Sequence, residues 1–107
     1  MFYKKDSSNY KEPLDGVNLK TLSYGENMSL VEFHLKKGCA VPLHSHPHEQ
    51  IGYLVSGKLR FECEGEEFLA EPGDSWQFPS NVEHMAEVLE DSVAVDIFMP
   101  VREEYMS

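Results

Sequence analysis

The chain has 107 residues, a formal net charge of −10 at pH 7 and a hydrophobic fraction of 41%. This length suits one domain with a modest core, and the hydrophobic fraction argues against a disordered chain. The acidic charge excludes nucleic acid as the expected partner, because phosphate binding needs a basic surface, and an anionic ligand would need a local positive group.

Short β-type runs separated by turn signals follow a polar, turn-rich opening segment. We expect residues 1–16 to form an arm or an edge strand, and residues 17–107 to form one β-barrel domain with a short C-terminal tail. The runs that predict strands are 28–35, 51–55, 58–63, 67–70, 76–78, 85–89 and 92–99, with turns at 64–66 and 71–74. Prolines punctuate these runs and helical periodicity is hard to find, so the pattern predicts an all-β barrel or sandwich.

The two cysteines, Cys39 and Cys63, are too few for a disulfide framework. We expect them to be small, buried or half-buried thiols in a reducing compartment. No basic-then-apolar leader opens the sequence, and no apolar run approaches the length that spans a membrane. The expectation is therefore a cytoplasmic protein without a membrane partner.

Three of the five histidines fall within residues 44–48, in the stretch HSHPH. In an extended backbone His44 and His46 point to the same side, where two imidazoles form half of a divalent-metal site. Strand parity places His48 and Gln50 on that face too, so periodicity alone does not choose the third ligand. A lone histidine on a strand is more often a surface or hydrogen-bonded residue, and this reading also stays open for the pair.

The spacing of this stretch resembles the first cupin motif, G-x5-H-x-H-x3,4-E-x6-G. Here the motif runs from Gly38 through His44, His46 and Gln50 to Gly57. Glutamine stands where most cupins have glutamate. This departure matters for chemistry, because the position belongs to a metal ligand in the family.

The second cupin motif, G-x5-P-x-G-x2-H-x3-N, resembles Gly73, Pro79, Asn81 and His84, with Val88 in place of the final asparagine. Asn81 replaces the motif glycine, and asparagine is the residue that next best tolerates left-handed backbone. Fifteen residues separate the two motifs, as in small microbial cupins. The resemblance covers residues from about 17 to 100 and implies a single cupin β-barrel, also called a double-stranded β-helix or jelly roll.

By this resemblance the metal ligands are His44, His46, Gln50 and His84. All four are neutral, so a divalent ion keeps its formal charge of about +2 and is a stronger Lewis acid than one bound by glutamate, although it is held less tightly. Glutamine at this position also disfavours chemistry with oxygen. Nickel, zinc, iron or manganese would each suit such a site, so the metal identity stays open. His48 is expected at the rim of the site or behind the ligands.

One charged residue, Asp96, interrupts the apolar run 92–99, on the face that also carries Phe98. An isolated carboxylate in an apolar wall is costly unless it is paired or bound to a cation, so a functional role and a structural hydrogen bond are both open. Arg102 is the only lysine or arginine in the last forty-seven residues. It could fold back over the barrel mouth and supply the local positive group.

The segments LHSHPHEQ and DIFMPVREEY carry a narrower resemblance, to the KdgF-type cupins of pectin and alginate breakdown. That family converts 4,5-unsaturated monouronates into the open-chain 5-keto-4-deoxyuronate, with a neutral His3Gln metal site and a D-x-F-x3-R pattern that Asp96, Phe98 and Arg102 match. On this hypothesis Asp96 is the general acid/base, Arg102 grips the substrate carboxylate and Phe98 forms an apolar wall against the sugar.

The sequence therefore predicts a metal-dependent enzyme that opens the ring of a small anionic sugar. Two other functions stay open: a metal-dependent dioxygenase, against which Gln50 speaks, and a non-catalytic module that binds a small acid or sugar. The face formed by Val93, Val95 and Ile97, together with the N-terminal arm, suggests a homodimer, which is the usual state in the family.

Overall fold

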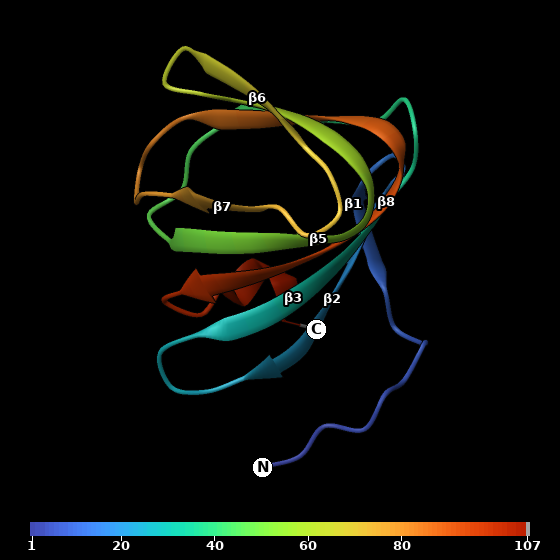
Figure 1. The fold of residues 1–107 in the computed structure, drawn as a ribbon. Helices are drawn as coiled ribbons and strands as arrows, with labels where there is room; N and C mark the ends of the chain where they lie inside the picture. Colours follow the sequence, from blue (N-terminus) through green and yellow to red (C-terminus); the bar gives the residue numbers. More distant parts are fainter. Residues whose placement is uncertain (107) are drawn as a thin grey trace.

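Eight strands and one short 3-10 helix make up the computed structural model, which describes residues 1–106. The elements are β1 (Lys11–Leu14), β2 (Val17–Tyr24), β3 (Ser29–Leu35), β4 (Ala40–His44), β5 (Glu49–Cys63), β6 (Glu66–Ala70), β7 (Ser75–Phe78), β8 (His84–Met99) and η1 (Glu103–Tyr105). The strand order is β1-β2-β3-β8-β5-β6, with β4 also pairing with β8 and β7 with β5, and all pairs are antiparallel. Figure 1 shows β5 and β8 curving round to enclose the barrel. The prediction of an all-β barrel is confirmed.

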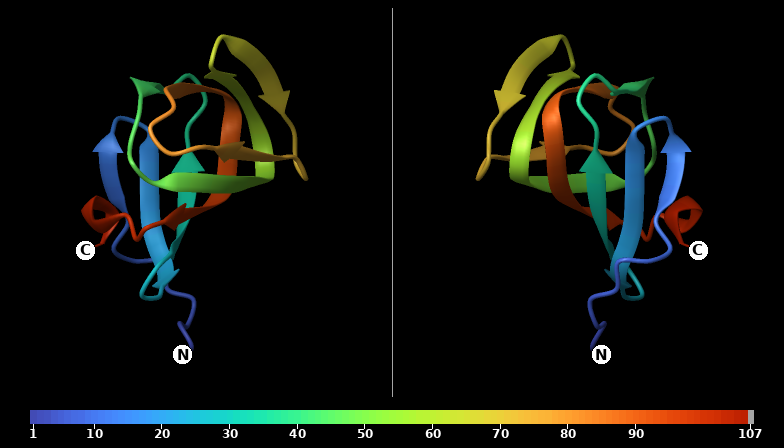
Figure 2. Two further views of the ribbon diagram at one scale, coloured as in Figure 1. Left: turned by 90° about the vertical axis from the view of Figure 1, so that its left-hand side faces the viewer. Right: turned by 90° about the vertical axis from the view of Figure 1, so that its right-hand side faces the viewer.

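Strands β5 and β8 are longer than the sequence predicted, and Figure 2 shows both bending around the barrel. The sequence pattern predicts four shorter runs in their place: 51–55, 58–63, 85–89 and 92–99. The register between the two strands shifts near Ser56 and Lys58. Gly57 has a φ of 96°, and a Cβ there would lie 2.1 Å from Oγ of Ser92. The turn-type residues thus make a bend inside paired strands and not the break that the sequence pattern predicts.

Two turn residues behave as their types predict. The β5–β6 connection consists of Glu64 and Gly65, with φ of 52° and 78°, which confirms the hairpin turn expected at 64–66. Asn81, which replaces the motif glycine, has a φ of 65°. Asparagine therefore fills the left-handed position that the motif reserves for glycine.

Alternation along β5 and β8 divides the side chains between the barrel interior and its outer face. Asp96 and Phe98 are 2% and 0% exposed, whereas Ile97 between them is 42% exposed. On β5, Leu54 is fully buried and Tyr53 is 48% exposed. The main core consists of Val17, Leu35, Leu54, Leu59, Phe61, Ala70, Trp76, Phe78, Ala86, Val88 and Ala94. Trp76, Phe78 and Ala94 of this core also line a cavity inside the barrel.

The N-terminal residues 1–10 have no regular secondary structure and precede the edge strand β1. The Tyr10 hydroxyl donates a hydrogen bond to Glu32 on β3, so this segment crosses the outside of β2 and β3. Cys39 and Cys63 are free and half-buried, as expected. Within residues 1–106 no helix is long and apolar enough to cross a membrane.

Candidate active site

Three histidines meet at one end of the barrel. His44 is the last residue of β4 and pairs directly with His84, the first residue of β8. His46 follows in the loop, where its carbonyl oxygen accepts a hydrogen bond of 2.8 Å from the backbone N–H of Asn81. Ligand nitrogens of the three rings all lie within 4.8 Å of one another. The spacing predicted that His44 and His46 share one strand, and this prediction is wrong. Strand β4 ends at His44, and the loop that follows carries His46 inward.

The backbone fixes the tautomer of each ring. Every Nδ1 atom lies 2.8–3.0 Å from a backbone carbonyl oxygen, those of Pro42, His48 and Val82. A carbonyl oxygen only accepts, so each Nδ1 carries the hydrogen and each Nε2 keeps a free lone pair. Such backbone contacts orient imidazoles for metal binding.

Burial also holds the rings in the form that binds metals. Burial, with a smaller effect of the Arg102 charge, lowers the pKa of His46 to about 4. Burial likewise lowers the pKa of His84, although the hydrogen bond to the Val82 carbonyl opposes it. Both imidazoles are therefore neutral at neutral pH, and neutral imidazole is the ligand form.

Gln50, the second residue of β5, lies between the histidines and the buried carboxylate. Its amide Nε2 donates a hydrogen bond of 2.6 Å to Oδ2 of Asp96, which turns its Oε1 toward His46. Oε1 lies 3.1 Å from Nε2 of His46. Because that Nε2 carries a lone pair, two acceptors face each other, as in a site that a cation completes. Three imidazole nitrogens and one amide oxygen thus fit a divalent metal.

Asp96 lies on the inner face of β8 and accepts two hydrogen bonds at the same oxygen. Besides Gln50, the indole Nε1 of Trp76 donates to Oδ2 at 3.1 Å. Burial raises the pKa of Asp96 to about 6, although both hydrogen bonds and the Arg102 charge act to lower it. The carboxyl group can therefore exchange a proton near neutral pH. The sequence analysis did not single out Trp76, which is the one tryptophan of the chain.

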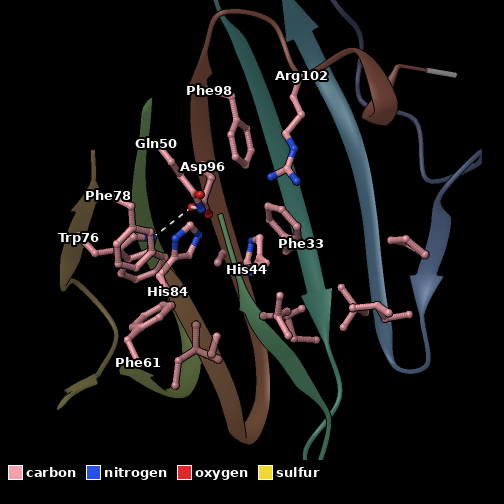
Figure 3. Close-up of a pocket in the computed structure, with 18 of the residues that line it drawn as sticks. Phe33, His44, Gln50, Phe61, Trp76, Phe78, His84, Asp96, Phe98 and Arg102 are labelled. Carbon is pink, nitrogen blue, oxygen red and sulfur yellow. Dashed lines mark hydrogen bonds between the residues drawn. The ribbon is translucent and has the colours of Figure 1, made fainter. Parts of the chain in front are cut away.

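Arg102 follows β8 and points back into the same cavity (Figure 3). Its guanidinium carbon lies 5.0 Å from the ring centre of Phe98 and 4.3 Å from that of Tyr105. Nε lies 3.5 Å from a carboxylate oxygen of Glu104, yet it is buried and makes no hydrogen bond within residues 1–106. Two aromatic rings therefore hold the cation in place and leave hydrogen-bonding capacity for a ligand. No motif in the sequence marks Tyr105 as a contact of Arg102.

His48 lies beside His46 and is 9% exposed. Its ring packs edge-on against Phe98, and its carbonyl oxygen faces Nδ1 of His46. Its own Nδ1 is buried without a hydrogen-bond partner in the described residues. The residue thus supports His46 through its backbone.

A cavity of about 250 Å³ lies beside these groups, although His46 and His48 are not among the residues that line it. His44, Gln50, His84, Asp96 and Arg102 supply its polar lining, and the remaining walls are mainly apolar, with Phe33, Phe61, Phe78 and Phe98 among them. Figure 3 shows Asp96 between Gln50 and Trp76, with Arg102 aimed into the same space. Such a cavity, apolar with a few convergent polar groups, is typical of a small-molecule site.

Residues 31–99, well over half of the chain, match the family described as the cupin domain, Cupin_2. The chain belongs to the cupin family. The cupin barrel implied by the two motifs is thus confirmed, and these motifs supply the three clustered histidines.

Several named proteins resemble this chain in sequence or in structure. This cupin is 29% identical over 107 residues to the pectin degradation protein KdgF of Dickeya dadantii (strain 3937), which covers 98% of this chain and 97% of that protein. The structure of KdgF from Halomonas sp. matches it with a TM-score of 0.92 at 30% identity, over 99% of this chain and 100% of that one. An RmlC-like cupin from Shewanella frigidimarina NCIMB 400 has a TM-score of 0.88 at 25% identity, with 94% and 90% covered. Oxalate decarboxylase OxdC of Bacillus subtilis (strain 168) is 31% identical over 80 residues, which are 70% of this chain but 21% of that protein.

Proposed function

We propose that this cupin is a metal-dependent enzyme that opens the ring of 4,5-unsaturated monouronates and yields 5-keto-4-deoxyuronate. The observation that carries the proposal is one cavity beside a set of neutral candidate ligands, with the buried Asp96 carboxyl group and the Arg102 guanidinium, which contacts two aromatic rings, in its lining. Similarity to KdgF along nearly the whole chain supports the same substrate class.

The metal would be held by Nε2 of His44, His46 and His84 and by Oε1 of Gln50. A divalent ion there supplies a Lewis acid that polarises substrate oxygen atoms. The four donors are uncharged, so they leave the positive charge of the ion available to an anionic substrate. Nickel, zinc, iron and manganese all suit three imidazoles and an amide, and the proposal does not choose among them.

Arg102 would bind the substrate carboxylate. A guanidinium matches a carboxylate with two parallel hydrogen bonds, which fixes orientation as well as position. The rings of Phe98 and Tyr105 restrict the guanidinium before the substrate arrives, at 5.0 and 4.3 Å from their centres. Phe98 also presents an apolar wall to the sugar, which limits the access of water to Asp96.

Asp96 would carry the proton that the reaction moves. Ring opening takes the proton from the anomeric hydroxyl while the ring C–O bond breaks, which leaves an aldehyde and an enolate. Ketonisation then places a proton on C4 of the enolate, so that the double bond becomes a ketone with no net gain or loss of electrons. A carboxyl group whose pKa is about 6 can accept the first proton and return the second at neutral pH.

The test is turnover of a purified 4,5-unsaturated monouronate, followed by the loss of ultraviolet absorbance of its double bond. Metal-loaded protein should exceed the uncatalysed rate, and chelation should abolish the difference. We expect Asp96→Asn to lower chiefly kcat and Arg102→Ala to raise chiefly KM by about tenfold or more, since a bound charge pair contributes roughly 1.5–3 kcal/mol. Glu103→Ala, in the exposed neighbour of Arg102, is the control. A rate equal to the uncatalysed one with metal bound would refute the proposal.

Two other functions expected from the sequence give different results in the same preparation. A dioxygenase would consume oxygen when supplied with iron. A non-catalytic module would bind the sugar without turnover and keep its affinity in Asp96→Asn. Gln50 disfavours the dioxygenase. The raised pKa of the buried Asp96 carboxyl group favours catalysis over binding alone.

The proposal includes a homodimer formed through the outer face of β5 and β8, in a reducing cytoplasm that suits two free thiols. This face carries the neighbouring apolar side chains of Ile51, Tyr53, Val55, Val93, Val95 and Ile97. None of the six is charged, so two copies of a chain with net charge −10 can meet there without pairing like charges. Light scattering should give twice the chain mass for the wild type and the single mass for Tyr53→Glu. Tyr24→Glu, at a similarly exposed tyrosine away from this face, should stay dimeric.

A further inference from the structure

Trp76, Gly52 and Asp96 form one row across three strands. Gly52 of β5 is the direct partner of Trp76 on β7 and of Asp96 on β8. All three residues occupy inward positions, and Trp76 and Asp96 are 7% and 2% exposed. Residues two strands apart are normally separated by the side chain between them. Here the row brings an indole N–H within 3.1 Å of a carboxylate oxygen.

The contact depends on the missing side chain at the centre of the row. A Cβ on Gly52 would lie 2.0 Å from Nε1 of Trp76 and 2.5 Å from Oδ2 of Asp96. Any other residue would therefore occupy the space in which the hydrogen bond forms. Glycine in the interior of a strand is unfavourable, and it often marks a close approach of neighbouring groups. The absence of a side chain at Gly52 thus leaves the space in which the Trp76 indole reaches Asp96.

Both hydrogen bonds to Asp96 reach the same oxygen. Gln50 donates to Oδ2 from one side and Trp76 donates to it from the other, at 2.6 and 3.1 Å. Oδ1 accepts no hydrogen bond from the described residues, and Asp96 lines the cavity. Two fixed donors on one oxygen set the rotation of the carboxylate and leave the second oxygen for a ligand.

We infer that Trp76 is a positioning residue for Asp96: its indole N–H holds Oδ2, through the gap at Gly52, so that Oδ1 is presented to the substrate. The inference rests on the proposed function for the role of Oδ1, whereas the hydrogen bond itself can be tested without any substrate. Gln50 would bind the metal as well as donate to Asp96. Trp76, by contrast, only donates a hydrogen bond to Asp96.

The hydrogen bond can be observed directly, because the chain has a single tryptophan and gives a single indole N–H resonance. We would record this resonance in protein loaded with zinc, which is diamagnetic. Asp96→Ala and Gly52→Ala should each move the indole proton upfield and speed its exchange with solvent. Asp91→Ala, at an exposed carboxylate elsewhere on β8, is the matched control and should leave the resonance in place. An unchanged resonance in Asp96→Ala would overturn the inference.

Kinetics then separate positioning from packing. Trp76→Phe keeps an aromatic ring and removes the N–H, and we expect kcat to fall by about 10- to 100-fold, the usual effect of losing a hydrogen bond to a charged group. KM and zinc content should stay within about twofold. Val88→Ala removes methyl groups from the same core cluster without lining the cavity, and should leave kcat unchanged although it lowers stability.

The experiments test the positioning role, the hydrogen bond and the proposed function separately. If Trp76→Phe matches Val88→Ala in kcat, the positioning role is refuted. If Trp76→Phe does not fold, the indole resonance in Asp96→Ala and Gly52→Ala still decides whether the hydrogen bond exists. If the wild type does not turn over the monouronate, the proposed function fails, and the resonance still reports whether Trp76 holds Asp96.

Discussion

Replacing Gln50 with glutamate restores the residue that most cupins carry at this position, and it perturbs the contact between the proposed metal ligands and Asp96. The substitution keeps the shape of the side chain and changes the amide nitrogen into a second oxygen. That oxygen would lie where Nε2 now donates to Oδ2 of Asp96 at 2.6 Å. An amide donor is thereby replaced by a carboxyl oxygen beside the buried carboxyl group of Asp96.

The size of the effect follows from this contact. A hydrogen bond to a charged group contributes about 1.5–3 kcal/mol, which corresponds to roughly a 10- to 150-fold change in rate. Two carboxylates in contact cannot both ionise, so one of the pair holds a proton at neutral pH and the pKa of Asp96 rises further above about 6. We therefore expect Gln50→Glu to lower kcat at pH 7 by at least tenfold, while the metal is bound as tightly as in the wild type or more tightly.

The assay is absorbance loss from the unsaturated monouronate at saturating substrate, with metal content measured on the same sample. Gln77→Glu is the matched control, because it makes the same chemical change at an exposed glutamine that donates to Glu49 at 3.1 Å. It should keep the wild-type kcat. Wild-type kcat in metal-loaded Gln50→Glu would refute the reasoning that the neutral amide is needed beside Asp96.

Two further predictions concern the ligands and the core. Burial lowers the pKa of His46 to about 4 and also lowers that of His84, so protons compete with the metal for these nitrogens only in acid. Metal content after dialysis should therefore persist at about pH 5.5, which is below the ordinary imidazole pKa of about 6.5. It should fall toward pH 4. Loss of half the metal at about pH 6.5 would contradict this. Leu54→Ala should lower the free energy of unfolding in urea by about 2–5 kcal/mol, since Leu54 is fully buried and does not line the cavity. Leu69→Ala, the same change at a leucine of β6 that is 53% exposed and lies outside the proposed dimer face, should cost less than about 1 kcal/mol. Equal costs for the two variants would contradict the assignment of the inner face.

Motif spacing chose between candidate ligands that periodicity left equal. Periodicity left His48 and Gln50 as equal candidates beside His44 and His46, because all four alternate along one segment. The cupin spacing favoured Gln50, and in the structure Gln50 faces His46 while His48 turns its ring against Phe98. The distinction depends on the loop after β4, which interrupts the alternation that a strand would keep.

Contacts between strands explain what the sequence did not predict. Ser56 and Gly57 look like the end of a strand when only neighbours in sequence are considered, yet cross-strand pairing continues past them. Trp76 reads as an ordinary inward residue of a short strand, and only the row through Gly52 shows that it reaches Asp96. Tyr105 stands nine residues beyond Asp96, and its contact with Arg102 depends on how the chain folds back after β8.

The most direct test of the account is an anomalous-diffraction map of crystals of the zinc-loaded protein. We expect one zinc peak bound by Nε2 of His44, His46 and His84 and by Oε1 of Gln50, with Gln50 still donating to Asp96. A zinc ion at another place, or one bound by the three histidines while Gln50 points away from it, would contradict the neutral four-ligand site on which the proposed chemistry depends.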